Sequence, residues 1–369
     1  MTGSGSSDSI DGCFSPDYFM ALERLREACR RKNLDVTSYI NPASEEARAA
    51  LAVDTTFIGD RSAQKILVIT SGFHGVELMC GSGCQTGLIE NDHLLTLRED
   101  IAVLLVHAVN PWGAAFLRRN NEDNVDLCRN FLDVTEACPV NPGYEAIHEA
   151  LCCPDAEGPR KEEAENILLD YRQRHGLPAF INAVISGQYQ HPDGMSYGGT
   201  GATWSRQTLE EILHHYAGNA EQVCLIDIHS GLGPYGHGTV VCMQQGENLD
   251  RARNWFGHEL MAPQLDAGSA RRHFHPTMGH PSQAYQRILK QAQVTSIVLE
   301  FGTYSSENNL KALLDDHWLE FNGDGRPETA GDIKSDILKA HYPDDPHWRE
   351  SVWAGCERVI RQSINGLMQ

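Results

Sequence analysis

Features that would place the chain in or across a membrane are missing from the sequence. No run approaches the ~20 consecutive apolar residues that a membrane helix needs, and the mean hydropathy is −0.38. The N-terminus lacks a basic stretch followed by an apolar one, the pattern of a secretory signal. We therefore expect a soluble, cytoplasmic protein.

Basic residues are few compared with acidic ones. The 369 residues include 30 Lys and Arg against 50 Asp and Glu, which gives a formal net charge of −20. Such a charge disfavours binding to nucleic acid or to an anionic membrane surface. It does not restrict small substrates, because a pocket can be basic inside an acidic protein. We expect neither a nucleic acid nor a membrane as partner, and the oligomeric state stays open.

Regular cysteine spacing is absent as well. The chain has 11 cysteines, an odd number, and no C-x-x-C pair. Reduced thiols in a cytosolic protein explain this distribution best, and a structural zinc site built from cysteines is the lesser alternative.

The sequence does contain short apolar segments separated by amphipathic ones. Five segments are nearly continuous in apolar residues, which is typical of strands buried on both faces. They are Lys65–Thr70, Ile101–Val109, Val223–His229, Thr239–Met243 and Thr295–Phe301. With helical stretches between them, they predict a single α/β domain with a mixed, mainly parallel central sheet flanked by helices. We expect this domain to cover residues 14–369, after a flexible tail over residues 1–13.

Histidines and glutamates follow three of these predicted strands. His74 and Glu77 come directly after the first strand, His229 ends the third, and Glu300 lies near the end of the last. Ligands in open α/β sheets bind outside the carboxyl ends of the strands, so these four side chains are expected to converge. Two His and one Glu form a ligand set for catalytic zinc that leaves a position open for water. A further carboxylate nearby can then act as general base.

Two other H-x-x-E pairs carry less weight than His74 and Glu77. His317/Glu320 and His347/Glu350 fall in amphipathic helical stretches with no strand before them. This placement predicts solvated helix faces rather than metal ligands.

A serine motif and a histidine cluster are further candidates. Residues 194–198 match the pattern G-x-S-x-G, but turn-like flanks replace the strand and helix that a nucleophile elbow requires. His273, His275 and His280 are interpreted as a polar loop near the pocket, with a second metal site as the lesser possibility.

Arginines are concentrated in a polar segment in the first half of the chain. Residues 118–131 read RRNNEDNVDLCRNF. Close to a metal, one arginine would polarise the scissile carbonyl and stabilise the oxyanion, and another would pair bidentately with a substrate carboxylate. A basic pair on a polar surface loop is the alternative reading of the same residues.

The ordered series HGVE, NPWG, VDLCRNF, DIHSG and LEFGT resembles the zinc carboxypeptidase superfamily. Within it, the chain is most similar to an uncharacterised carboxypeptidase-like branch, a domain of unknown function, which is related to the aspartoacylase and succinylglutamate desuccinylase group. The resemblance extends from about Phe14 to the C-terminal helix.

The resemblance implies a metal centre and a catalytic base. One zinc ion per chain would be held by His74, Glu77 and His229, and Glu300 would be the general base. Asp126 would orient the first histidine from behind.

The resemblance also implies substrate-binding residues. Arg119 would polarise the carbonyl, with Arg118 as the alternative in a substrate-binding position. Arg129 would bind a substrate carboxylate beside Cys128, which stands where the superfamily has asparagine. Tyr304, in the segment LEFGTY, is expected to join the substrate-binding set.

The function implied is that of a zinc-dependent metallohydrolase. A carboxypeptidase-like hydrolase would cleave a peptide or amide bond in a peptide or small molecule that bears a carboxylate. An N-acyl amino acid deacylase of aspartoacylase type is the alternative with the same metal. A metal- or peptide-binding module without catalysis is the alternative of another class, and Cys128 is its only support.

Overall fold

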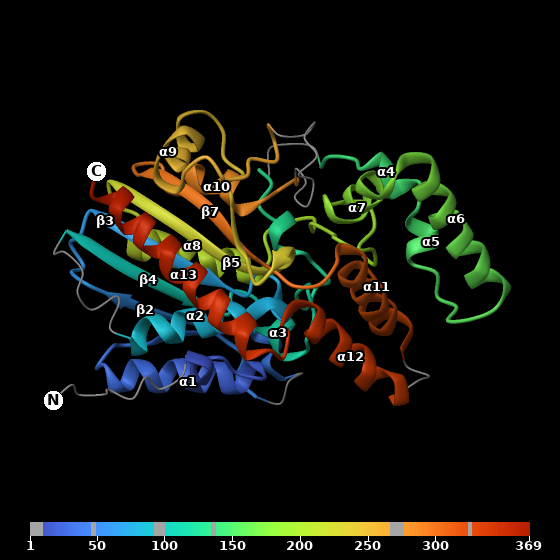
Figure 1. Cartoon of the computed structure of the whole chain (residues 1–369), viewed down its shortest axis with the longest axis horizontal. Coiled ribbons are helices and arrows are strands. Elements are labelled where there is room, and N and C mark those ends of the chain that lie inside the picture. The colour runs from blue at the N-terminus through green and yellow to red at the C-terminus, as the bar shows by residue number, and fades with distance from the viewer. Residues whose placement is uncertain (1–9, 46–48, 92–99, 134–137, 266–276, 324–326) are drawn as a thin grey trace.

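A seven-stranded sheet organises the computed structural model, in the order β1-β2-β4-β3-β5-β7-β6 (Figure 1). The structure describes residues 10–45, 49–91, 100–133, 138–265, 277–323 and 327–369. The strands β1 to β7 are Thr37–Ile40, Ala52–Ile58, Lys65–Ser71, Ile101–His107, Gln222–Tyr235, Gly238–Val241 and Gln293–Gly302.

The centre of the sheet is parallel and its edges are antiparallel. β4, β3, β5 and β7 are parallel neighbours, whereas β1, β2 and β6 pair in antiparallel fashion. This confirms the predicted mixed, mainly parallel sheet. β1 and β2 were not predicted, because β1 is short and mostly exposed and β2 is interrupted by the polar run Asp54-Thr55-Thr56.

Both faces of the central strands are apolar because both are covered by helices. Along β3, Leu67 and Ile69 belong to one hydrophobic core, and Ile66 and Val68 belong to the core on the opposite face. Alternate residues of a strand point to opposite faces, so a strand covered twice must be apolar at nearly every position.

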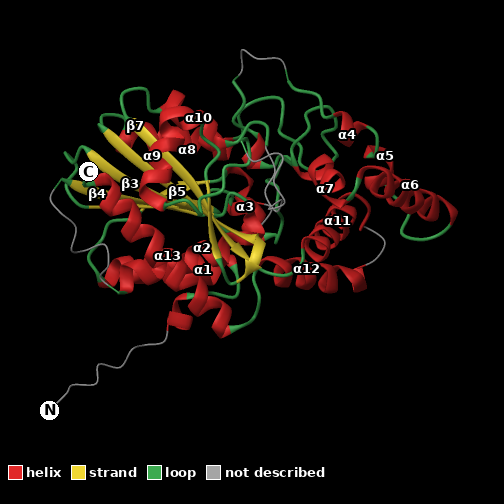
Figure 2. Ribbon diagram, turned by 45° about the horizontal axis from the view of Figure 1, so that its top comes forward, coloured by secondary structure: helices red, strands yellow, loops and turns green. Residues whose placement is uncertain are grey.

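Helices cover both cores. Helices α1 (Tyr18–Arg31), α2 (Leu78–Glu90), α9 (Gly246–Phe256) and α13 (Pro346–Leu367) pack on one face. Helices α8 (Trp204–Ala217) and α10 (Pro281–Ile288) pack on the other. Figure 2 shows the sheet lying between these layers. Among the described helices, none combines the length and apolar content that crossing a membrane would require.

The remaining helices gather beyond one end of the sheet (Figure 1). They are α3 (Pro111–Ala115), α4 (Pro142–Glu145), α5 (His148–Leu151), α6 (Pro159–His175), α7 (Leu177–Ile185), α11 (Ser306–Asn322) and α12 (Pro327–His341). Single turns of 3-10 helix are η1 (Ile10–Cys13), η2 (Pro42–Glu45), η3 (Gly75–Glu77) and η4 (Leu127–Arg129). Of the predicted tail, residues 1–9 lie outside the described residues, and the last four form η1.

Candidate active site

The turn after β3 positions the first two candidate ligands. His74 precedes the 3-10 turn η3, and Glu77 ends it. A Cβ atom on Gly75 would lie 2.1 Å from the carbonyl carbon of Gly113. Only glycine fits at this position, and its close packing against α3 holds His74 and Glu77 at the edge of the sheet.

His229 and Glu300 are brought together by the register of two parallel strands. They are directly paired residues of β5 and β7. Residues paired in this way place their side chains on the same face of the sheet. The structure thus brings the four predicted side chains to one edge of the sheet, where all four line one pocket.

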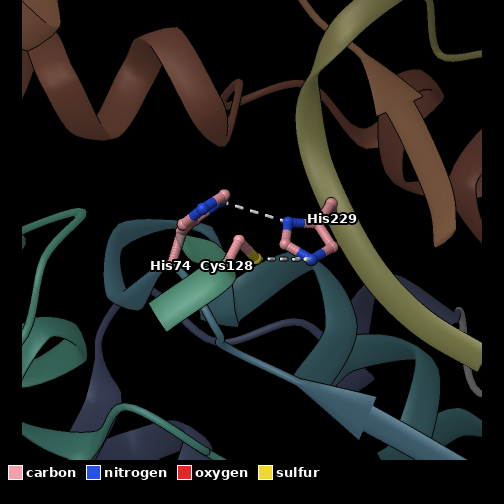
Figure 3. A group of neighbouring side chains, drawn as sticks. All are labelled: His74, Cys128 and His229. Atoms are coloured by element: carbon pink, nitrogen blue, oxygen red, sulfur yellow. Dashed lines mark hydrogen bonds between the residues drawn. The ribbon is translucent and has the colours of Figure 1, made fainter. Parts of the chain in front are cut away.

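Three of these side chains converge on a single point. Nδ1 of His74 lies 2.8 Å from Oε1 of Glu77, and Nδ1 of His229 lies 2.8 Å from Oε2 of the same carboxylate. The two Nδ1 atoms are 3.2 Å apart. Figure 3 shows the two imidazoles directed at each other, with the Cys128 thiol beside them.

The opposite nitrogen of each imidazole faces a carboxylate. Nε2 of His74 is 3.2 Å from Oδ1 of Asp126, and Nε2 of His229 is 2.6 Å from Oδ2 of Asp227. A carboxylate behind a histidine fixes the ring and directs the lone pair of the other nitrogen forward. Asp227 was not predicted, although the spacing D-x-H on a strand places both side chains on one face and could have identified it.

The donor set fits a zinc ion. Tetrahedral Zn–N bonds of about 2.0–2.1 Å place two ligand nitrogens about 3.3 Å apart, which agrees with the 3.2 Å between the Nδ1 atoms. Burial and Arg119 act to lower the pKa of His74, but the surrounding acidic groups outweigh them and raise it to about 10. Burial acts to raise the pKa of Glu77, and the two imidazoles hold it well below its usual range. The site therefore favours positive charge, as a cation site must.

Glu300 lines the same pocket. Its Oε1 accepts a hydrogen bond from the backbone N–H of Leu232 at 3.0 Å. Burial and the charge of Glu77 raise the pKa of Glu300 to about 7. A carboxyl group with a pKa near neutrality can accept and return a proton under physiological conditions.

The two neighbouring arginines have different surroundings. Arg119 lines the pocket and donates from Nε to Asp126 at 3.2 Å and from Nη1 to Glu77 at 3.3 Å. Arg118 points away from this pocket and forms ion pairs with Asp316 and Glu320 on α11.

Arg129 and Cys128 also line the pocket. Arg129 donates from Nε to the carbonyl oxygen of Ile185 at 3.0 Å and from Nη1 to that of Cys128 at 3.1 Å. The Cys128 thiol lies 4.0 Å from Nε2 of His229. One potential ligand atom each from His74, Cys128 and His229 lies within 4.8 Å of the others.

The remaining predicted residues lie in different places. Tyr304 is 46% exposed, its ring 6.0 Å from that of Tyr235, and it is not among the residues that line the pocket. His280 lines the pocket and caps α10, whereas residues 273 and 275 lie outside the described residues.

Two alternatives from the sequence can be compared with the structure. Ser196 lies in an irregular segment between α7 and α8, so the strand and helix of a nucleophile elbow are absent there. His347 is exposed, as predicted. The interpretation of His317 as solvated was wrong: its side chain is buried, and its Nε2 lies 3.5 Å from the Cys152 thiol.

The pocket combines a polar floor with an apolar wall. It has about 890 Å³ of empty volume, part of it open to solvent. Helices α7 and α11 contribute Ile181, Ile185, Leu310 and Leu313 to the wall. The sheet contributes Val241 and Val298, and Met243 follows β6. A substrate bound near Glu300 would therefore contact apolar side chains.

The sequence model of a family described as "Protein of unknown function (DUF2817)" matches residues 14–355. The chain belongs to this family. This confirms the predicted membership of a domain of unknown function. No curated protein matches the chain significantly.

Several solved structures are similar to the chain at low sequence identity. A carboxypeptidase A from Helicoverpa armigera is 12% identical over 95% of this chain and 77% of its own, with a TM-score of 0.45. Thrombin activatable fibrinolysis inhibitor is 10% identical over 95% and 80%, with a TM-score of 0.47. The murein-tripeptide amidase MpaA from Escherichia coli O157 is 14% identical over 94% and 100%, with a TM-score of 0.33.

Proposed function

We propose that the protein is a metal-dependent hydrolase of a peptide or amide bond, with zinc held by His74, Glu77 and His229. The observation that carries this proposal is the convergence of two Nδ1 atoms on both oxygens of one carboxylate, at 2.8 Å each. Hydrogen bonding alone does not require two imidazoles to meet in this way. A ligand set for one cation explains it, and the carboxylates of Asp126 and Asp227 behind the rings support it.

The bound ion would supply a Lewis acid that polarises a carbonyl group and promotes the ionisation of water. Glu300 would take the proton from the attacking water and return it to the leaving nitrogen. Burial and the charge of Glu77 raise its pKa, which favours the protonated form that returns the proton. Arg119, held between Glu77 and Asp126, would stabilise the negative charge that develops on the carbonyl oxygen, and it is favoured over Arg118, which is paired with α11.

The substrate would present a carboxylate and an apolar group. Arg129 provides a buried guanidinium in the pocket, although two backbone carbonyls already accept hydrogen bonds from it. The wall formed by α7 and α11 is apolar, so it would accommodate an aliphatic or aromatic group. A peptide with an apolar C-terminal residue has both groups, the carboxylate for Arg129 and the apolar side chain for the wall.

A substrate screen with the zinc-loaded protein tests this function. N-blocked dipeptides ending in Leu or Phe are compared with the same dipeptides as C-terminal amides and with N-acetyl amino acids. Release of the free terminal amino acid, strongly reduced in Glu300→Gln, is the expected result. Cleavage of N-acetyl amino acids alone would establish the deacylase instead, and no turnover of any member by the metal-loaded protein would favour a binding module.

A further inference from the structure

A second group of metal-binding side chains lies among the helices beyond the sheet. His148 begins α5, and Cys152 directly follows its last residue. His191 and Asp193 lie in the loop after α7. One ligand atom each from His148, His191 and Asp193 lies within 4.8 Å of the others. None of these residues lines the candidate active site.

The Cys152 thiol is not one of this group but lies beside one of its histidines. Its sulfur lies 3.7 Å from Nδ1 of His148. Zinc bonds of about 2.3 Å to sulfur and 2.0–2.1 Å to nitrogen, at a tetrahedral angle, separate the two ligand atoms by about 3.5–3.6 Å. The sulfur and the nitrogen are therefore spaced nearly as they would be around one zinc ion.

Other side chains support these ligands from behind. Oε1 of Glu145 lies 3.0 Å from Nε2 of His191. A carboxylate accepts the proton of that nitrogen, which leaves Nδ1 of His191 with a free lone pair. Nε2 of His317 on α11 lies 3.5 Å from the Cys152 sulfur, within reach of a hydrogen bond.

The two imidazoles must tilt to bind one ion. The rings of His148 and His191 stack with centroids 3.6 Å apart and an interplanar angle of 23°. Because a lone pair lies in the plane of its ring, each ring has to rotate about its Cβ–Cγ bond to face a shared ion. A cavity lined by Cys152, Asp193 and His317 adjoins the group.

We propose that His148, Cys152, His191 and Asp193 bind a second metal ion, zinc by the chemistry of the set. Nitrogen, sulfur and a single carboxylate match the ligand preference of zinc. One thiolate and one carboxylate with two neutral imidazoles balance the charge of a divalent cation. Four protein ligands leave no open position, so the ion is structural.

The position of this site indicates what the ion would stabilise. Its ligands come from α5 and from the loop after α7, and Cys152 contacts His317 on α11. Helices α7 and α11 form the apolar wall of the candidate active pocket. The ion would therefore fix these helices relative to each other and hold the wall in place.

Counting metal ions in the full-length chain tests this proposal independently of the proposed catalytic function. The metal-free protein is titrated with zinc, washed, and analysed for metal content. We expect two ions in the wild type and one in His229→Ala, and we expect Cys152→Ala to lose one further ion in either background. Cys153→Ala is the matched control, because that neighbouring thiol lies near the backbone oxygens of Asp155 and Arg160 rather than near a histidine.

Cobalt substitution identifies the sulfur ligand directly. In the background His229→Ala with Cys128→Asn, cobalt should give a thiolate-to-metal absorption band that disappears with Cys152→Ala and persists with Cys153→Ala. The proposal is overturned if the well-folded His229→Ala protein binds no ion, or if Cys152→Ala retains the band. If the His229 variants do not fold, the cysteine variants of the wild type decide: equal ion counts in wild type, Cys152→Ala and Cys153→Ala exclude the site.

Discussion

Two histidine clusters in this molecule are built by different means. The first lies at the carboxyl ends of parallel strands, where register alone makes His229 and Glu300 neighbours. The second lies on a single helical turn and a loop, with His148 and His191 brought together by the packing of α4, α5 and α7. Strand pairing fixes which residues are neighbours, so the sequence predicts which side chains meet at the edge of a sheet. A loop between short helices follows no such rule.

The clusters also differ in how far they are removed from water. The side chains of His229 and of Asp227 behind it are each 4% exposed. The corresponding pair in the second cluster, His191 and Glu145, is 27% and 37% exposed. Electrostatic interactions are stronger where water is excluded, so substitutions in the first cluster should have the larger effects.

The largest expected effect is that of His229→Ala. Removing one of three protein ligands should abolish metal binding at the first cluster and, with it, all measurable hydrolysis. Metal analysis after equilibration with zinc should show the loss of one ion per chain, while the ion proposed at the second cluster stays bound. An unchanged metal content would rule out His229 as a ligand.

Glu300→Gln should affect the rate and leave the metal in place. Loss of the general base is expected to lower kcat by about two orders of magnitude or more. As a base, Glu300 acts in its ionised form, so wild-type activity should fall as the pH drops through its pKa. That pKa is about 7 without the ion. The charge of a bound cation would lower it, so the fall in activity at acidic pH should occur below pH 7. The residual activity of Glu300→Gln should not show this fall at acidic pH. A loss of metal in this variant would instead identify Glu300 as a metal ligand.

Removing the carboxylates behind the ligands provides a direct comparison of the two clusters. Asp227→Asn should weaken zinc binding at the first cluster by about 10- to 100-fold, the range found for such outer carboxylates. Glu145→Gln should weaken binding at the second by only a few-fold, because the exposed pair is screened by water. Competition with a zinc chelator measures both. Equal losses would show that exposure does not distinguish the clusters.

The sequence was most informative where strands end. The continuous apolar runs predicted β3, β4, β5, β6 and β7. The residues at or after the ends of the predicted strands indicated that His74, Glu77, His229 and Glu300 would converge. Asp227 was missed although its strand was identified, because only its position relative to His229 reveals a role. β2 was missed because burial of polar Asp54 depends on Arg26, which lies 28 residues away in sequence and contacts it at 2.6 Å.

The environment of a helical residue was harder to predict than that of a strand residue. His317 lies on an amphipathic helix that resembles a surface helix, yet its side chain faces Cys152, 165 residues earlier in the chain. No periodicity encodes a contact between segments so distant in sequence. Arg118 and Arg119 could not be ranked for the same reason, since only the position of α11 shows that Arg118 pairs with Asp316.

The smallest expected effect concerns the thiol of the first cluster. Each cluster has a cysteine beside a histidine, but Cys128 lies near Nε2 of His229, the nitrogen already held by Asp227. It therefore lies behind the ring rather than on the side where the Nδ1 atoms converge. Cys128→Asn should leave the zinc content unchanged, whereas Cys152→Ala should lower it.

Cys128→Asn should instead act on the substrate carboxylate beside Arg129. An amide donor replaces a weak thiol donor, and one neutral hydrogen bond contributes about 0.5–1.5 kcal/mol. The KM for free-acid substrates should fall by roughly threefold to tenfold, with little change in kcat and no change for C-terminal amides. Cys128→Ala, which adds no donor, is the control and should not lower KM. If free acids and amides respond alike, Cys128 does not act on the substrate carboxylate. If zinc is lost, Cys128 is a metal ligand, as proposed for Cys152.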